Sequence, residues 1–410
     1  MLETRIAKEL AYISQAGLER RITEMHFVNP AQAQDRNGNT YLVLASNNYL
    51  GLTHAPEVIE AASRAALKFG TGSSGSRLTT GGTFIASELE KRLADFKHSE
   101  SALVFNTGYM TNLGVLYGLL QTGDVVFSDE LNHASIIDGC RISRCKVVVY
   151  KHNDMADLQR LLETENVTGQ RFIVTDGVFS MDGDIADLPS LAVLKKNFNA
   201  CLIVDDAHGV GVIGNDGSGT ASHYGLTDVI DLQVGTLSKA LAAEGGYVAG
   251  KKILIDYLIN RSRPFIFSTA LAPATLAAAN AALLLLQTQA QKYLDSLRAN
   301  SRLMRRLLLE GGLNVVEGIT PIIPVVIGEA GLTMQFADRL KSKGILVSGI
   351  RPPTVPRGES RLRITVTAAH CEEQLRQAAQ IITALWQELK QGEKKEGLIN
   401  VGNRRYGNGY

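Results

Sequence analysis

The chain has 410 residues, of which 45% are hydrophobic and 20% are charged, as is typical of a globular protein with more than one domain. Its formal net charge of +1 gives no basic excess for nucleic acid, and no apolar run reaches the length of a membrane span. We therefore expect neither a nucleic-acid partner nor a membrane segment.

The first twenty residues mix acids and bases and contain no apolar core of a signal peptide. The cysteines have neither zinc-binding spacing nor the pattern of a disulfide framework; they are Cys140, Cys145, Cys201 and Cys371. We expect a cytoplasmic protein in a reducing compartment, with no bound metal.

The N-terminal segment, residues 1–45, is predicted to contain a helix and a hairpin. Apolar residues spaced along residues 3–22 predict an amphipathic helix, and an Asn-Gly turn at 35–39 predicts a hairpin between strands at 25–28 and 41–44. A helix at 57–69 follows.

Glycine and serine are dense at residues 70–82, which suggests backbone that lies close to a ligand or another chain. The run lacks the Gly-Lys-Ser/Thr ending of a P-loop, so we reject that interpretation.

Strands alternate with helices from about residue 100 to 250, which predicts a mostly parallel sheet with helices on both faces. The predicted strands cover residues 102–105, 124–129, 146–150, 172–175, 201–204 and 229–234. Such sheets bind ligands at the carboxyl ends of their strands. There, the turn at Thr107, Gly108 and Tyr109 offers backbone N–H groups to a phosphate, and the imidazole of His133 can stack on a flat cofactor.

Asp205 and His208 follow an apolar strand and can point into one crevice. A buried carboxylate needs a cationic partner, and the protonated pyridine nitrogen of pyridoxal phosphate (PLP) is one. The plainer interpretation makes Asp205 a helix cap and His208 a hydrogen-bonded loop residue.

Lys239 lies at a strand exit among small residues and hydroxyls, after Thr236 and Ser238. A lysine desolvated at a pocket floor loses its proton readily and can form a Schiff base, whereas a solvated loop lysine stays charged. The combination of Asp205, His208 and Lys239 favours a PLP site.

Residues 209–214 match Gly-x-Gly-x-x-Gly, the pattern of a dinucleotide-binding dehydrogenase. The match continues as Asn215-Asp216-Gly217 and not as a helix, so we interpret it as a glycine loop.

An Ala/Leu-rich helix at residues 273–297 leads into a second domain with strands at 322–327, 345–347 and 362–366 and a closing helix at 372–389. We divide the chain into a large domain (46–285), a small C-terminal domain (286–391) and a polar, disordered tail (392–410).

Several stretches resemble the α-oxoamine synthases, PLP enzymes of fold type I that condense an amino acid with an acyl thioester. They are Ser46–Leu52, Asn132–Ser135, Val178–Gly183, Asp205–Gly209 and Ser238–Lys239. The resemblance spans about residues 20–389. It implies an α/β fold whose large domain has a mostly parallel, seven-stranded sheet flanked by helices, a smaller α+β C-terminal domain, and a homodimer with its site at the subunit interface.

The resemblance also implies roles for individual residues. Lys239 would bind PLP covalently and act as acid and base, Asp205 would pair with the ring nitrogen, and His208 with the ring hydroxyl. His133 would stack on the ring and contact substrate. Further cofactor contacts are implied for Thr107, Gly108, Tyr109, Ser180 and Thr236, and, toward the partner's phosphate, Ser268 and Thr269. The implied substrate contacts are Asn47 and Arg363 for the amino-acid carboxylate, and Arg21 and Arg351 for the acyl group.

Residues 350–356, 361–363 and 367–370 resemble the family member that joins L-alanine to a pimeloyl thioester, of CoA or acyl-carrier protein, in biotin biosynthesis. The alternatives are a glycine acetyltransferase that uses acetyl-CoA and a silent partner subunit, which should have lost Lys239 or Asp205. Asn48 and Asp176 stand where relatives often have Asp and Glu, and we expect both to affect substrate affinity.

Overall fold

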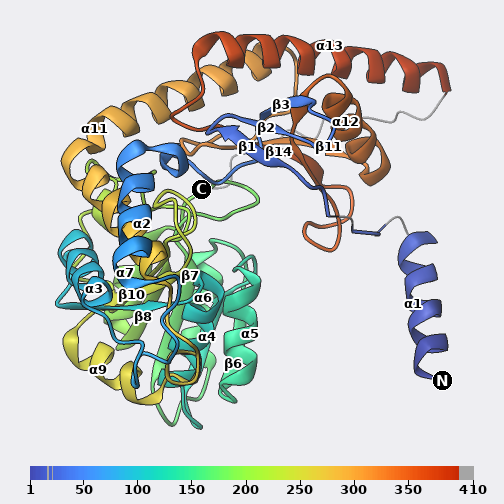
Figure 1. The fold of residues 1–410 in the computed structure, drawn as a ribbon. Helices are drawn as coiled ribbons and strands as arrows, with labels where there is room; N and C mark the ends of the chain where they lie inside the picture. The colour runs from blue at the N-terminus through green and yellow to red at the C-terminus, as the bar shows by residue number, and fades with distance from the viewer. Residues whose placement is uncertain (16–17, 21, 397–410) are drawn as a thin grey trace.

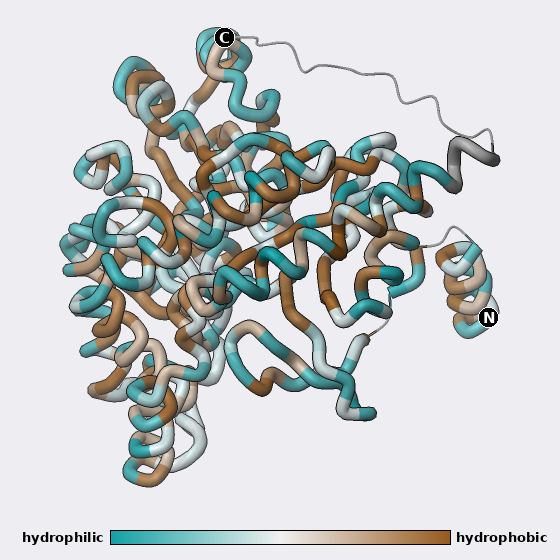
Figure 2. Tube along the Cα trace, turned by 90° about the horizontal axis from the view of Figure 1, so that it is seen from above, coloured by the Kyte–Doolittle hydropathy of each residue, from teal (hydrophilic) through white to brown (hydrophobic). Residues whose placement is uncertain are grey.

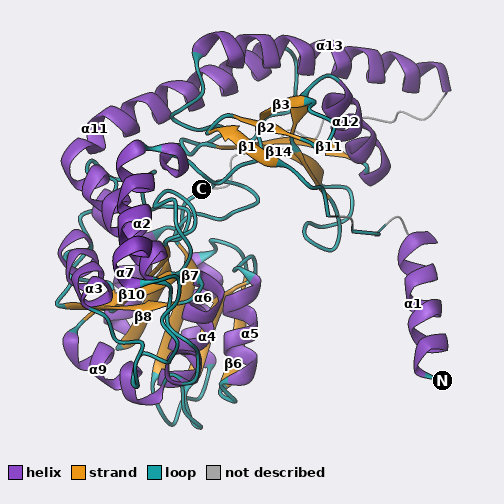
Figure 3. Ribbon diagram, viewed as in Figure 1, coloured by secondary structure: helices purple, strands orange, loops and turns teal. Residues whose placement is uncertain are grey.

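The computed structural model describes residues 1–15, 18–20 and 22–396. They form a large domain and a smaller one, which a long helix connects (Figure 1, Figure 3).

A seven-stranded sheet forms the centre of the large domain, in the order β4-β10-β9-β8-β7-β5-β6. Its strands are β4 (Ser101–Phe105), β5 (Val125–Asp129), β6 (Lys146–Tyr150), β7 (Arg171–Asp176), β8 (Ala200–Asp205), β9 (Leu232–Thr236) and β10 (Gly246–Gly250). In this sheet β10 runs antiparallel to both neighbours, and β9, β8, β7, β5 and β6 pair in parallel. The predicted mostly parallel sheet is confirmed.

Helices cover both faces of this sheet. On one face α4 (Gly108–Leu119), α5 (Ala134–Ile142), α9 (Lys252–Arg261) and α10 (Arg263–Ile266) share an apolar cluster with alternate strand residues. On the other face lie α3 (Phe84–Phe96), α6 (Met155–Thr164) and α7 (Leu188–Asn197). The remaining elements of this domain are η1 (Leu52–His54), α2 (Pro56–Phe69) and α8 (Thr220–His223).

The small domain contains two sheets. The first sheet has the order β1-β2-β3-β12 and consists of β1 (His26–Asn29), β2 (Gln32–Gln34), β3 (Thr40–Val43) and β12 (Ile345–Leu346). The second sheet has the order β11-β14-β13 and consists of β11 (Ile322–Gly328), β14 (Ser360–Thr365) and β13 (Ser348–Ile350). Helix α12 (Ala330–Ser342) packs on both sheets, and α13 (Glu372–Glu396) packs on α12 and shares their apolar cluster. Because β12 pairs in parallel with β3, the N-terminal strands belong to the same body as the C-terminal region.

Helix α11 (Pro273–Glu310) runs from the large domain to the small one, where it meets α13 (Figure 1). It packs on α2 and α3, and its backbone departs from helical geometry at Gln289 (φ −134°, ψ 22°). The helix extends beyond the predicted end at residue 297.

Other predictions differ from the structure. The predicted hairpin between residues 25–28 and 41–44 is wrong: the turn at 35–39 joins β2 to β3, and β1 pairs with β2. The strand predicted at 229–234 is observed at Leu232–Thr236. Helix α1 (Leu2–Gln15) ends before residue 22, none of its residues is buried, and it lies apart from both domains (Figure 1). Helix α13 continues to Glu396, past the predicted start of the tail at 392, while residues 397–410 lie outside the described residues.

The outer helices alternate between hydrophobic and hydrophilic residues, as expected for helices that bury one face (Figure 2). Among the described residues, no helix is long and apolar enough to cross a membrane. The same part of the chain contains no group of His, Cys, Asp and Glu that could hold a metal ion.

Candidate active site

The predicted site residues lie at the carboxyl ends of four adjacent strands, β5, β7, β8 and β9. His133 follows β5, Asp176 ends β7, Asp205 ends β8, and Lys239 follows β9. The charge of Lys239 acts on Asp176, His133 and His208, and the charge of Asp205 acts on Asp176, His133 and Lys239. The structure thus brings together residues that are far apart in the sequence.

Asp205 is buried and held by two donors. Its Oδ2 accepts a hydrogen bond of 2.6 Å from Asn112 Nδ2 of α4, and its Oδ1 accepts one of 3.0 Å from Ala207 N. The Asn112 amide also donates to Ser135 Oγ at 2.9 Å. The sequence analysis did not single out Asn112. Its position in an apolar helix is a signal that could have found it, because a buried amide needs hydrogen-bond partners.

Lys239 leaves β9 through a turn that Thr236 stabilises. The Thr236 hydroxyl donates to Gly245 O at 3.0 Å and accepts from Ser238 N at 3.2 Å. Burial lowers the pKa of Lys239, and the positive charge of Arg363 acts in the same direction, whereas Asp205 and Asp176 oppose it. A lysine amine in these surroundings deprotonates more readily than one in water.

Asp176 and Asp205 are two buried carboxyl groups at neighbouring strand ends. Burial, and after it the negative charge of Asp205, raises the pKa of Asp176 well above its usual range. Asp176 Oδ2 accepts a hydrogen bond of 2.9 Å from His133 N, and Asp176 N donates to Asn132 Oδ1 at 2.8 Å. Asp176 therefore fixes the turn that presents His133.

The two predicted cofactor histidines are held differently. His133 caps α5, and its Nδ1 lies 2.7 Å from Ser135 Oγ. His208 is buried, and its Nδ1 lies 2.7 Å from the hydroxyl of Tyr49. Burial, together with the charge of Lys239, keeps the pKa of His208 well below its ordinary value, so this imidazole is neutral at pH 7. Sequence reasoning did not single out Tyr49.

Arg363 brings the small domain to the site. It lies on β14, is 5% exposed, and donates from Nη2 to Asn47 Oδ1 at 3.2 Å. Its Nε donates to the carbonyl oxygen of Ser180, in the loop after β7. The predicted carboxylate-binding residues Asn47 and Arg363 are therefore adjacent, and the backbone of Ser180 contacts Arg363.

The predicted phosphate-binding residues surround the N-terminus of α4. Thr107 caps this helix by accepting from Met110 N at 3.0 Å, and a Cβ on Gly108 would lie 3.3 Å from the Thr236 side chain. The Tyr109 hydroxyl donates to Asp138 of α5. Thr269 follows Ser268, and its carbonyl oxygen accepts from Asn106 Nδ2 at 2.7 Å, so this segment lies beside the same helix end.

Arg351, which is predicted to contact the acyl group, reaches the N-terminal segment. Arg351 Nη2 donates to Glu19 O at 3.3 Å, and among the described residues no contact joins Arg351 to Lys239 or Arg363. Arg21 lies outside the described residues.

Asn48 is buried, its Nδ2 donates to Thr53 Oγ1 at 2.8 Å, and its Oδ1 has no partner among the described residues.

The arrangement fits PLP, the cofactor that the sequence predicts. It offers a lysine that deprotonates readily, a buried carboxylate for the ring nitrogen, a neutral histidine, and free backbone N–H groups at a helix start for a phosphate. The residues that would hold the group are Lys239, Asp205, His208, His133, Thr236 and the Thr107–Tyr109 turn.

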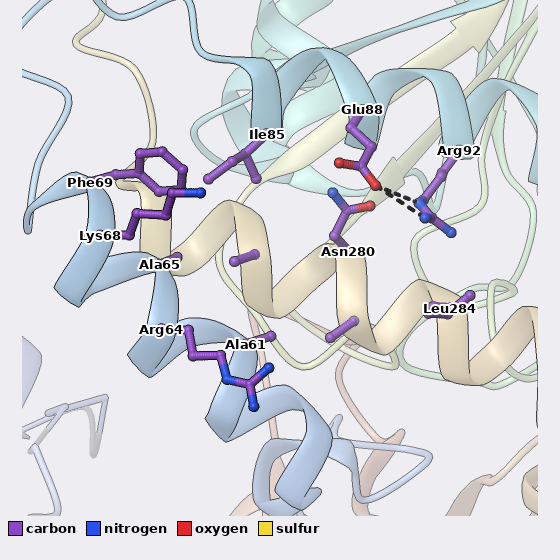
Figure 4. A pocket seen from close by; sticks show the side chains of 12 residues that line it. Ala61, Arg64, Ala65, Lys68, Phe69, Ile85, Glu88, Arg92, Asn280 and Leu284 are labelled. Atoms are coloured by element: carbon purple, nitrogen blue, oxygen red, sulfur yellow. Dashed lines mark hydrogen bonds and ion pairs between the residues drawn. The ribbon is translucent and has the colours of Figure 1, made fainter.

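A shallow cavity of about 330 Å³ lies elsewhere, between α2, α3 and α11 (Figure 4). Ala65 and Ala281 line it, and so do Arg92 and Glu88, which form an ion pair. None of the predicted site residues lines it, so this cavity is separate from the candidate site.

Comparisons with known proteins show the family to which this chain belongs. A model of the family "Aminotransferase class I and II" matches residues 39–382. An 8-amino-7-oxononanoate synthase of Lysinibacillus sphaericus is 47% identical over 374 residues, which are 91% of this chain and 96% of the relative. The 8-amino-7-oxononanoate synthase 2 of Bacillus subtilis is 45% identical and covers 95% of this chain and 99% of the relative.

Solved structures of related enzymes superpose on this chain. A serine palmitoyltransferase from S. paucimobilis, solved with a bound PLP–myriocin adduct, superposes with a TM-score of 0.88 at 31% identity, over 94% of this chain and 97% of that one. An 8-amino-7-oxononanoate synthase from Francisella tularensis superposes with a TM-score of 0.73 at 30% identity, over 86% of this chain and 98% of that one.

Proposed function

Since this chain belongs to the class I and II aminotransferase family and, within it, to the α-oxoamine synthases, we propose that it makes 8-amino-7-oxononanoate. It joins L-alanine to the pimeloyl group of a thioester and releases CO2 and the free thiol, a step of biotin biosynthesis. The observation that carries this proposal is that Lys239, Asp205 and Arg363 lie close together at one edge of the sheet. The chain also matches 96% of the length of an 8-amino-7-oxononanoate synthase.

Arg363 and Asn47 bind the carboxylate of alanine. A guanidinium can hold a carboxylate through two parallel hydrogen bonds, which fixes the plane of the bonds at Cα. The backbone of Ser180 holds the Arg363 guanidinium in place. The amino acid is thereby oriented with its Cα proton toward Lys239.

When bound, PLP supplies an electron sink conjugated with the amino-acid Cα. The lowered pKa of Lys239 makes its amine available to take the Cα proton and later to return one. Asp205 would hold a proton at the pyridine nitrogen, and Asn112 keeps the Asp205 carboxylate aligned for this role. The neutral His208 would face the hydroxyl of the cofactor ring, and His133 would cover the ring.

We further propose a homodimer whose interface passes beside the site. The segments around Ser73 and Ala270 are joined by hydrogen bonds of 2.7 Å (Ser73 Oγ to Ala270 O) and 2.9 Å (Ala270 N to Gly75 O). Large apolar side chains on and next to these segments are exposed: Leu78 (52%), Phe84 (93%) and Phe267 (69%). A second copy would cover them and bring its Ser268 and Thr269 toward the phosphate. Cytoplasmic location stays a prediction.

The test is a spectrophotometric titration of the PLP-loaded protein with L-alanine, glycine and L-serine, followed by pimeloyl-CoA, pimeloyl-acyl-carrier protein or acetyl-CoA. The proposal expects saturable alanine binding and thiol release only with a pimeloyl donor. A response to glycine with acetyl-CoA alone would move the chain to the acetyltransferase branch. No spectral change with any amino acid would favour the silent subunit.

A further inference from the structure

His152 lies between two carboxylates outside the catalytic cluster. Its Nδ1 is 3.0 Å from Asp129 Oδ1, and its Nε2 is 2.9 Å from Asp184 Oδ2. Its ring forms a T-shaped pair with the ring of Phe179, with 4.4 Å between ring centres and 83° between ring planes. The ring thus has a partner on three sides.

A neutral imidazole carries one N–H and can donate to only one of these carboxylates. Two carboxylate oxygens at hydrogen-bond distance from opposite ring nitrogens require both nitrogens to be protonated. The two hydrogen bonds raise the pKa of His152 to about 10 against the cost of burial. The side chain is therefore an imidazolium at physiological pH.

Asp129 controls the turn that ends in His133. It closes β5, accepts from Leu131 N at 2.9 Å through Oδ1, and accepts from Asn132 N at 3.2 Å through its carbonyl oxygen. His133 is the next residue. A displacement of the Asp129 carboxylate would therefore displace the start of α5.

Asp184 controls the loop that contains Ser180. Its carbonyl oxygen accepts from Phe179 N at 3.0 Å, and Gly183 N donates to Phe179 O at 2.8 Å, so residues 179–184 form a closed turn. The tip of this turn accepts hydrogen bonds from the small domain: Arg363 donates to Ser180 O, and Arg361 donates to Asp182.

Asn153 reinforces the link between the two loops. Its N donates to Asp129 Oδ2 at 2.9 Å, its Nδ2 donates to Ile185 O at 3.0 Å, and its Oδ1 accepts from Asp187 N at 3.0 Å. The dipeptide His152–Asn153 therefore joins the turn after β5 to the loop after β7.

We propose that His152 is a positioning residue: held by both ring nitrogens between Asp129 and Asp184, it fixes the His133 turn against the Ser180 loop, which orients Arg363. It touches neither substrate nor cofactor and acts through these two loops. Its effect on amino-acid binding rests on the proposed function, whereas its protonation state does not.

The first experiment is side-chain ¹⁵N NMR of the unmutated holoenzyme at a pH of about 8.5, where a histidine with an ordinary pKa is neutral. We expect one imidazolium with two protonated ring nitrogens, and it should change in Asp184→Asn. A fully neutral histidine spectrum at that pH would overturn the proposal, whatever reaction the enzyme catalyses.

The second experiment measures KM for L-alanine and kcat in His152→Gln. The control is His98→Gln, which removes an exposed histidine whose Nε2 lies 3.5 Å from Asp216. We expect His152→Gln to raise KM about tenfold with a smaller change in kcat, because the orientation of the carboxylate-binding Arg363 is lost while Lys239 stays in place. The control should match the unmutated enzyme.

Charge repulsion supplies a rescue that a merely structural role would not predict. His152→Gln leaves Asp129 and Asp184 as unpaired carboxylates, and Asp184→Asn in the same chain removes one of these charges. The double variant should therefore recover most of the KM and of the thermal stability that the single variant lost. An unchanged KM in folded His152→Gln would refute the positioning role, and no recovery in the double variant would show that the lost imidazole bridge, and not charge repulsion, causes the rise in KM.

Discussion

Lys97 and Asp206 form an ion pair in which the side chains are 0% and 2% exposed, with 3.0 Å between Nζ and Oδ2. Asp206 also accepts from Thr220 N and Thr220 Oγ1, and its carbonyl oxygen accepts from Gly209 N at 3.0 Å. The pair thus lies behind the turn that carries Asp205 and His208, and holds it from the side opposite to the site.

Removal of Lys97 should destabilise the fold strongly. In Lys97→Met the Asp206 carboxylate loses its cation while it stays buried, and loss of one partner of a buried pair costs about 3–5 kcal/mol. Chemical denaturation of the PLP-loaded protein measures this change. The matched control is Lys252→Met, whose partner Asp256 is half exposed, and there we expect less than about 1 kcal/mol. Equal effects in the two variants would contradict the buried-pair argument.

Lys239→Ala should abolish both turnover and the absorbance band of the covalently bound cofactor, because it removes the amine that forms the covalent bond. Noncovalent PLP should still bind through Asp205, His208 and the start of α4. Absorbance after gel filtration and a thiol-release assay measure the two effects. The control is Lys251→Ala, because Lys251 is the exposed residue that precedes α9. Full turnover in Lys239→Ala would remove this lysine from the mechanism.

Arg363→Lys should lower kcat/KM for L-alanine about 10- to 100-fold, because an ammonium cannot hold a carboxylate through two parallel bonds or reach both Asn47 and Ser180. Steady-state kinetics with alanine varied at saturating acyl donor measure the change. Arg339→Lys, in an exposed pair with Glu388, should have no effect. An unchanged kcat/KM in Arg363→Lys would place the carboxylate elsewhere.

His152 should make stability fall as the pH rises. Its folded-state pKa of about 10 exceeds the ordinary value of 6.5, so its contribution is complete below 6.5, decreases with rising pH, and is lost near 10. The charged groups around it are Asp129, Asp184 and Glu130, whose carboxylate accepts from His152 N at 2.8 Å. Melting temperatures at several pH values between these limits should decline less steeply in His152→Gln than in the unmutated protein. Parallel curves would contradict this assignment.

Periodicity and strand–helix alternation were enough to predict the large sheet, because parallel strands buried on both faces appear as continuous apolar runs. The same two patterns did not predict β10, whose first and last residues are Gly246 and Gly250. A Cβ on Gly246 would lie 2.6 Å from Gly108 Cα, so close packing requires glycine there and removes the β-branched residues that mark a strand. The N-terminal strands looked like a separate segment, because their partner β12 comes much later in the chain.

The site was predictable where its residues follow strands. Asp205, His208 and Lys239 stand directly after apolar runs, and the carboxyl ends of adjacent strands converge. Asn112 and His152 were missed because their roles depend on partners far away in the sequence: Asp205 for Asn112, and Asp184 for His152. No local pattern encodes such a pairing.

The parallel pairing of β3 with β12 has a consequence for how the protein is made. The edge of β3 is ready early in synthesis, but the strand that covers it leaves the ribosome only after the whole large domain has been translated. For that interval the nascent chain carries an open strand edge, the kind of surface on which polypeptides aggregate. Chaperone demand should therefore be highest just before residues 345–346 emerge.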